Sequence, residues 1–226
     1  MSESKFFDHS YDVVVVGTGA AGLATAMGAS DEGLRVLLLE STGRWGGNTS
    51  MSGGGMWMPS NPLMQRDGAG DSREEALTYL EATVGDEGRA TMRARKEAFV
   101  DGVADFVTTA EKYGVTFVRA ADYPDYYPEL PGGKIGRGLE VKPFDIKKIG
   151  GWWQTCQAPA ALPVKTDDVW LLGRAWSTPA GLVRGAQLVF RALGGAVTGK
   201  KLGGIGAGLP RRSSMSSCRS RVLSCG

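Results

Sequence analysis

Histidine and cysteine are scarce in this chain of 226 residues, which has one histidine and three cysteines. A catalytic Ser–His or Cys–His pair needs a histidine beside its nucleophile, and His9 is far in sequence from Cys156. The other two cysteines, Cys218 and Cys225, have no histidine near them and a spacing that fits no common metal-ligand pattern. We therefore expect no catalytic triad and no metal site, with Cys156 as a small buried side chain and His9 on the surface.

Long apolar runs are also absent: no stretch of 18 apolar residues exists, which excludes a membrane-spanning helix of ordinary composition. The first residues, MSESKFFDHS, lack the apolar segment of a secretion signal, so we expect a cytoplasmic protein. Residues 210–226 contain no acidic residue but four of the 26 basic ones, so the net charge of +2 comes from this tail. The tail has no interleaved aromatic residues, and we expect no nucleic-acid partner.

Glycine is abundant, with 34 residues, and the first glycines form a dinucleotide-binding pattern in YDVVVVGTGAAG. The run Val13–Val16 predicts a strand buried on both faces, and residues 20–31 predict a helix that Gly33 ends. Between them, the G-x-G-x-x-G spacing allows a tight turn, a close approach of backbone to a pyrophosphate, and close packing of helix on strand. The helix N-terminus also favours phosphate. The expected contacts in this turn are Gly17, Gly19, Ala20, Ala21 and Gly22.

The segment LRVLLLE predicts a second buried strand that ends at Glu40, 18 residues after Gly22. An acidic residue at this position accepts hydrogen bonds from a ribose diol and disfavours a 2′-phosphate. Strand, glycine turn, helix, second strand and acid therefore predict an α/β fold with a Rossmann-like parallel sheet and helical insertions. The cofactor is expected to be FAD or NAD rather than NADP.

A second glycine-rich segment, STGRWGGNTSMSGGGMWMP, follows Glu40 directly. Its glycines and hydroxyl side chains indicate a backbone that lies along a ligand and donates hydrogen bonds to it. A flexible linker is the alternative. The large apolar residues Trp45, Met51, Met56 and Trp57 disfavour a linker.

With these motifs, the chain resembles the flavoproteins of the fumarate reductase and succinate dehydrogenase group. In that group the second glycine-rich segment runs along the pyrophosphate and ribityl chain of FAD. The motif position of covalent flavin attachment has no histidine here, so the resemblance implies non-covalent FAD. The implied contacts, beyond the first glycine turn, are Glu40, Ser41, Gly46, Gly47, Thr49, Ser52, Gly53, Gly54 and Gly55.

Helical periodicity predicts three helices in the remainder of the chain. Residues 72–84 begin with a capping box, residues 87–113 end at Gly114, and residues 178–193 have Thr178 as N-cap and Pro179 in first position. The segment VTFV predicts a strand after the second helix. The following segment, ADYPDYYPELPGGK, is either a proline-stiffened surface loop or the wall of an apolar pocket, and its composition favours neither.

A narrower resemblance is carried by SGGGMWMPSNPLMQRDG, DYYPELPGGK, GRGLEVKPFD and TGKKLGGIG. Together these segments are similar to 3-ketosteroid Δ1-dehydrogenases, from about Tyr11 to Leu209. The resemblance implies 1,2-desaturation of a 3-oxosteroid, with a tyrosinate removing the C2 proton and flavin N5 accepting a hydride from C1. It implies Tyr126 as helper of the base, although the neighbouring Tyr127 is an alternative match. The electron acceptor stays unknown.

The similarity stops near Leu209, so we expect residues 1–209 to be the N-terminal part of an FAD-binding domain and residues 210–226 to be an aberrant, disordered tail. A changed reading frame is one explanation, and a genuine tail is the other. In the family the main base and the ketone-polarising groups lie further along, so the resemblance implies no turnover by these residues alone. The rival functions are a 5α-steroid Δ4-dehydrogenase, a fumarate-reductase-like enzyme, a non-catalytic FAD-binding fragment and an NAD-dependent enzyme.

Overall fold

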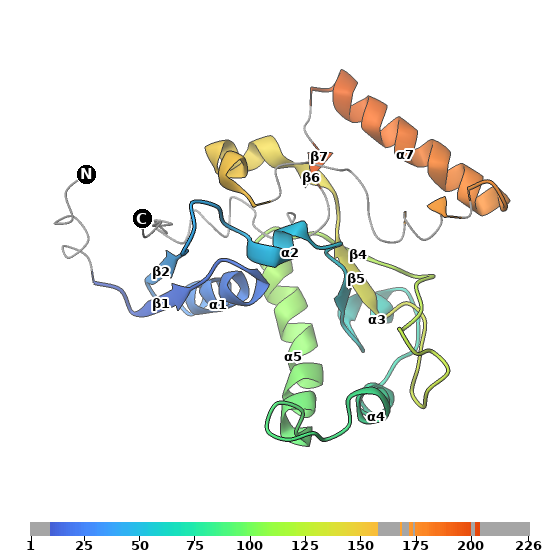
Figure 1. Ribbon diagram of the computed structural model, residues 1–226, viewed down its shortest axis with the longest axis horizontal. Coiled ribbons are helices and arrows are strands. Elements are labelled where there is room, and N and C mark those ends of the chain that lie inside the picture. Colours follow the sequence, from blue (N-terminus) through green and yellow to red (C-terminus); the bar gives the residue numbers. More distant parts are fainter. Residues whose placement is uncertain (1–9, 158–167, 169–171, 174, 200–201, 204–226) are drawn as a thin grey trace.

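The computed structural model describes residues 10–157, 168, 172–173, 175–199 and 202–203 (Figure 1). His9 and the whole of residues 210–226, with Cys218 and Cys225, lie outside the described residues. Within them, a small parallel sheet and one helix form the N-terminal unit, and a long helix lies between this unit and an antiparallel sheet (Figure 1).

The N-terminal unit consists of strands β1 (Val13–Val16) and β2 (Val36–Leu39) with helix α1 (Ala20–Asp31) between them. The two strands pair in parallel, from Val13 opposite Val36 to Val16 opposite Leu39. Side chains of β1, β2 and α1 form one apolar cluster, composed of Val15, Ala26, Val36 and Leu38. The predicted strand–helix–strand unit with a parallel sheet is therefore confirmed.

The two-sided burial that we predicted for β1 is wrong. Val15 is buried beneath α1, but Val14 is 55% exposed and Val16 is 79% exposed. Successive side chains of a strand point to opposite faces of the sheet. The described residues thus cover one face of β1 and leave the other face open, so a continuous β-branched run does not by itself establish two covered faces.

Helix α5 (Arg93–Lys112) lies between the N-terminal unit and a three-stranded antiparallel sheet. That sheet has the order β3 (Met56–Trp57), β5 (Gly138–Val141), β4 (Phe117–Arg119). A continuous apolar cluster joins these parts and includes Met27 of α1, Val103 and Val107 of α5, Phe117 of β4 and Leu139 of β5.

Two shorter helices, α3 (Pro62–Arg66) and α4 (Arg73–Val84), connect β3 to α5. The Ser72 hydroxyl accepts a hydrogen bond from the Glu75 amide at 3.1 Å, so the predicted N-cap of α4 is confirmed. The Glu75 carboxylate contacts Lys134 instead of closing the capping box. A turn around Gly88 separates α4 from α5, which begins at Arg93 rather than at residue 87 as predicted.

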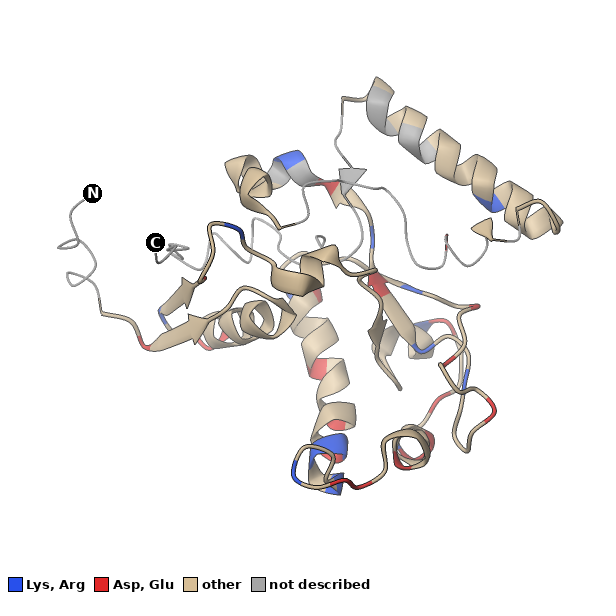
Figure 2. Cartoon of the chain, viewed as in Figure 1, with Lys and Arg blue, Asp and Glu red and all other residues tan. Residues whose placement is uncertain are grey.

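Opposite charges face each other where α4 and α5 pack together, at the lower end of α5 in Figure 2. Arg73 at the start of α4 pairs with Asp101 of α5 at 2.6 Å, and Lys96 pairs with Glu81 at 2.8 Å. These ion pairs join α4 to α5 and are consistent with a helical scaffold.

The remaining elements are β6 (Phe144–Asp145), the 3₁₀ segment η2 (Ile146–Thr155), α7 (Pro179–Val197) and β7 (Leu202–Gly203). Thr178 caps α7 as predicted, with its hydroxyl 3.1 Å from the Gly181 amide. Cys156 is buried as predicted, in a cluster with Trp45, Phe144 and Ile149. Among the described residues, no helix has both the length and the apolar character needed to cross a membrane.

Candidate functional site

The first glycine turn joins β1 to α1 and requires glycine at two positions. Gly17 has φ +99°, and its amide donates to the Leu39 carbonyl at 2.8 Å, which holds the turn against the end of β2. A Cβ on Gly22 would lie 2.0 Å from the Gly17 carbonyl oxygen. Helix α1 can therefore pack this closely on the turn only because Gly22 has no side chain.

Thr18 lies inside this turn and is the buried centre of the site. Its hydroxyl donates a hydrogen bond to the Glu40 carboxylate and accepts one from the Gly46 amide at 2.8 Å. Its own amide also donates to Glu40, at 3.1 Å. One side chain thus joins the first glycine turn, the acidic end of β2 and the second glycine-rich segment.

Sequence reasoning did not single out Thr18. It occupies a variable position of the G-x-G-x-x-G pattern, where the spacing specifies no residue type. The available signal was a hydroxyl side chain between two glycines, in a turn whose buried groups need hydrogen-bond partners.

Glu40 is half-buried, and its carboxylate faces donors on both sides. One oxygen accepts from Thr18, and the other accepts from the amides of Ser41 at 2.8 Å and Thr42 at 3.3 Å. The hydrogen bond from the Thr18 hydroxyl is the largest cause of a lowered pKa for Glu40, burial opposes it, and the neighbouring amides add to the lowering. Glu40 is therefore an ionised acceptor at neutral pH, as recognition of a ribose diol requires.

The second glycine-rich segment lies directly against the first. A Cβ on Gly47 would be 3.8 Å from the Cα of Gly19, and the Thr49 hydroxyl accepts a hydrogen bond from the Ala20 amide at 3.0 Å. Part of this segment forms a short helix, α2 (Gly47–Met51). Gly46, with φ +103°, precedes α2 and redirects the chain.

The stretch Ser52–Gly55 follows α2 and leads into β3. The Ser52 hydroxyl donates to the Thr49 carbonyl at 2.7 Å and accepts from the Gly54 amide at 3.2 Å. Ser52, Gly53 and Gly55 are exposed. The two glycine segments together present bare backbone at the N-terminus of α1, beside the Glu40 carboxylate, and this arrangement fits a dinucleotide.

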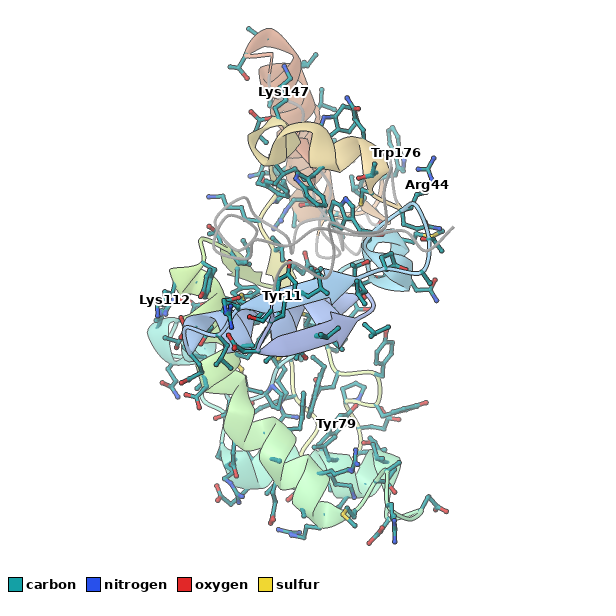
Figure 3. The ribbon with its side chains drawn as sticks, turned by 90° about the vertical axis from the view of Figure 1, so that its left-hand side faces the viewer. Tyr11, Arg44, Tyr79, Lys112, Lys147 and Trp176 are labelled. Carbon is teal, nitrogen blue, oxygen red and sulfur yellow. The ribbon has the colours of Figure 1, made fainter. Side chains whose placement is uncertain are left out.

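Tyr126 lies apart from these segments, in the loop of residues 123–136, which we call the tyrosine loop. Its side chain is 85% exposed and that of Tyr127 is 54% exposed. The Tyr127 amide donates to the hydroxyl of Tyr79, a residue of α4 (labelled in Figure 3), at 3.0 Å. No hydrogen bond among the described residues joins Tyr126 to the glycine segments, so the structure brings the cofactor residues together but not Tyr126 with them.

A buried ion cluster at the base of the tyrosine loop was also missed from the sequence. Arg137 is fully buried and bonds to Asp125 at 2.8 Å and to Asp71 at 2.8 and 2.9 Å. Burial acts to lower the pKa of Arg137, but Asp71 and Asp125 raise it overall. Burial likewise acts to raise the pKa of Asp71, while hydrogen bonds from Arg137 and the Ser60 amide lower it overall. Arg137 and Asp71 therefore both keep their charges at neutral pH.

Comparison with known proteins agrees with this geometry. A family described as "FAD binding domain" matches residues 12–201. A 3-oxosteroid 1-dehydrogenase of Mycolicibacterium smegmatis is 37% identical over 207 residues, which are 88% of this chain and 36% of that protein. A 4-oxocyclohex-2-ene-1-carboxylate 5-dehydrogenase of Sinomonas cyclohexanicum is also 37% identical, over 148 residues, which are 62% of this chain and 23% of that protein.

A solved structure has the same fold over nearly all of the chain. The 3-ketosteroid Δ1-dehydrogenase of Sterolibacterium denitrificans, in complex with 1,4-androstadiene-3,17-dione, aligns with a TM-score of 0.80 and 28% identity. The alignment covers 95% of this chain and 40% of that protein, so the chain spans well under half the length of these relatives. With a glycine-lined dinucleotide site and a family match over residues 12–201, this chain belongs to the FAD binding domain family and is related to 3-oxosteroid 1-dehydrogenases.

Proposed function

We propose that the chain is the FAD-binding part of a 3-oxosteroid 1-dehydrogenase. The observation that carries this proposal is the 37% identity to such an enzyme over 88% of the chain, which extends far beyond the glycine motifs. The fold similarity to a steroid-bound relative over 95% of the chain supports the same assignment.

The residues around Thr18 fit FAD. Gly17, Gly19 and the N-terminus of α1 would hold the pyrophosphate, because backbone without side chains lets a phosphate come close and amides at a helix N-terminus donate hydrogen bonds to it. Glu40 would accept hydrogen bonds from the ribose hydroxyls. The second segment, Gly46–Gly55, would follow the cofactor away from the pyrophosphate. When bound, FAD supplies a hydride acceptor.

Tyr126 would act on the substrate rather than hold the cofactor. Desaturation next to a ketone needs a proton to be removed from the carbon beside the carbonyl group, and a phenol that hydrogen-bonds to the base can help to move that proton. The exposure of Tyr126 leaves its hydroxyl accessible to groups outside these residues. Its aromatic ring also suits an apolar polycyclic substrate.

A chimaeric enzyme tests this proposal. Residues 1–209 would be joined to the part of the Mycolicibacterium smegmatis relative that lies beyond the matched region, and turnover of 4-androstene-3,17-dione would be measured with a dye as electron acceptor. We expect 1,2-desaturation, with kcat reduced about tenfold or more by Tyr126→Phe. Tyr127→Phe is the matched control and should change kcat little. A folded chimaera that binds FAD without desaturating the steroid would contradict the proposal.

A small cyclic keto acid is the second candidate substrate, because the Sinomonas cyclohexanicum relative is named for one. Its sequence identity to this chain is also 37%, although over a shorter region than that of the steroid enzyme. Recognition of a carboxylate favours a free arginine. Arg137 beside the tyrosine loop is instead bound to Asp71 and Asp125, and Arg119 is bound to Asp67 at 2.7 Å. The same chimaera, supplied with 4-oxocyclohex-2-ene-1-carboxylate, distinguishes the two substrates.

A further inference from the structure

We propose that Arg137, Asp125 and Tyr79 are positioning residues that hold Tyr126 at the tip of the tyrosine loop. The role of Tyr126 itself rests on the proposed function, whereas the way it is held is argued from the contacts of the loop. Three features carry this inference: the pairing of the two arms of the loop, the buried guanidinium that joins them, and the anchors on either side of Tyr126.

The two arms of the tyrosine loop pair with each other. The Asp125 amide donates to the Lys134 carbonyl at 2.8 Å, and the Gly136 amide donates to the Tyr123 carbonyl at 2.8 Å. The Lys134 amide returns a bond to the Asp125 carboxylate at 2.9 Å. The backbone before Tyr126 is therefore fixed by the arm that follows it.

The Arg137 guanidinium joins both arms to the start of α4. It bonds to the Asp125 side chain in the first arm and, at 2.8 Å, to the Gly132 carbonyl in the second arm. Its other nitrogens bind Asp71, directly before the N-cap of α4. A buried arginine shared by two carboxylates holds a fixed geometry, because each lost bond would leave a charge unpaired away from water.

Asp125 also connects the loop to the strand that continues the second glycine-rich segment. The indole N–H of Trp57 donates to the Asp125 carboxylate at 2.7 Å. Trp57 belongs to β3, which begins directly after Gly55, and it pairs with Gly138 of β5, the residue after Arg137. The Arg137 guanidinium lies over the Trp57 ring, 5.5 Å from its centre. A movement of Asp125 would thus move the loop relative to the end of the cofactor segment.

Tyr126 lies between two anchored residues. On one side is Asp125, and on the other is Tyr127, whose amide is bound to the Tyr79 hydroxyl. A tyrosine that only packs the loop would be covered, but Tyr126 is 85% exposed. The backbone of Tyr126 is therefore held in place while its phenol is exposed. This is the arrangement expected of a residue that acts on a bound substrate or on another residue beyond the loop.

The test uses the full chain with FAD and 3-fluorotyrosine at its six tyrosines. The fluorine resonance of Tyr126 is identified by its loss in Tyr126→Phe. Tyr79→Phe removes one hydroxyl and keeps the ring, and we expect it to shift or broaden the Tyr126 resonance. Asp125→Asn should do the same. Tyr113→Phe, the same change in a half-buried tyrosine at the end of α5, should leave the Tyr126 resonance unchanged.

An unchanged Tyr126 resonance in a folded Tyr79→Phe variant would overturn the role of Tyr79, and the same result in Asp125→Asn would overturn the role of the ion cluster. Failure of the proposed function has a different signature. If the Tyr126 resonance moves as expected while the steroid chimaera shows no turnover, the positioning stands and the assignment of substrate is contradicted.

Discussion

The hydroxyl of Thr18 has a donor on one side, the Gly46 amide, and an acceptor on the other, the Glu40 carboxylate. Both partners belong to segments that are far from Thr18 in sequence and that we propose to line the cofactor site. A buried hydroxyl with both of its hydrogen bonds made is costly to replace, because its partners then lose them away from water. The geometry of the proposed FAD site therefore depends on the hydrogen bonds of one buried side chain, Thr18.

Thr18→Val keeps the shape of this side chain and removes the hydroxyl. We expect the free energy of unfolding to fall by about 1–3 kcal/mol and the affinity for FAD to fall as well. Denaturant unfolding and a flavin fluorescence titration measure the two effects. Thr25→Val is the control, because the Thr25 hydroxyl lies on the exposed side of α1 and bonds to the Ala21 carbonyl there. Equal effects of the two substitutions would contradict the central place of Thr18.

The lowered pKa of Glu40 makes one contribution to stability depend on pH. Because the folded state lowers this pKa below its usual value of 4.5, the contribution is present above that value and is lost as the pH falls through the folded-state pKa. Glu40→Gln removes the ionisable group. We expect the stability difference between wild type and Glu40→Gln to be largest near about pH 7 and to shrink toward about pH 3, measured by urea unfolding. A difference that stays constant with pH would refute this assignment.

Helix α1 and the turn before it position backbone without side chains at the proposed cofactor site. Two glycines of this helix, Gly22 and Gly28, differ in how closely other atoms approach them. Gly22 faces the Gly17 carbonyl at a distance that admits no Cβ, while a Cβ on Gly28 would meet nothing within 4 Å. Glycine is thus required for close packing at Gly22 but not at Gly28, six residues further along α1.

Gly22→Ala and Gly28→Ala are a matched pair for this element. We expect Gly22→Ala to destabilise the fold by about 1–3 kcal/mol, because the turn must move away from the helix, and to weaken FAD binding. Gly28→Ala should instead stabilise the helix by roughly 0.5–1 kcal/mol. Thermal unfolding followed by circular dichroism measures both. If Gly22→Ala were as harmless as Gly28→Ala, the close packing of α1 on the turn would be disproved.

Local signals made several elements predictable. The N-terminal helix and the cap at Ser72 follow from patterns that neighbouring residues determine, and both agree with the structure. Contacts between distant segments were not predictable in this way. Thr18 and Arg137 bond to residues that only the folded chain brings near, and a buried arginine has no periodic signature in sequence. The sequence pointed to the two glycine segments of the proposed cofactor site, but not to Thr18, the side chain that joins them.

Across the whole molecule, burial is uneven. Apolar side chains of α1, α5 and the antiparallel sheet form a continuous core, whereas Val14 and Val16 of β1 and several apolar side chains of α7 are exposed. The prediction that β1 is covered on both faces failed. The β-branched residues of the strand indicate that it can be buried, but burial of the second face also needs another element packed against it, and the described residues provide none.

The adjacent residues Val15 and Val16 of β1 therefore differ in how much they contribute to the stability of the fold. Val15→Thr places a hydroxyl in the apolar cluster under α1, and we expect it to lower the free energy of unfolding by about 1–3 kcal/mol. Val16→Thr alters an exposed side chain and should change that energy by less than about 0.5 kcal/mol, while reducing aggregation seen by light scattering. If Val16→Thr were the more destabilising of the two, the open face of β1 would be contradicted.

The central claim, that two glycine-rich segments joined through Thr18 form an FAD site, is tested most directly by titrating the purified chain with FAD. Calorimetry gives the stoichiometry, and quenching of flavin fluorescence gives the affinity. We expect about one FAD per chain, with affinity lost in Gly22→Ala and retained in Gly28→Ala. A chain that unfolds cooperatively, and is therefore folded, yet takes up no FAD would contradict the account.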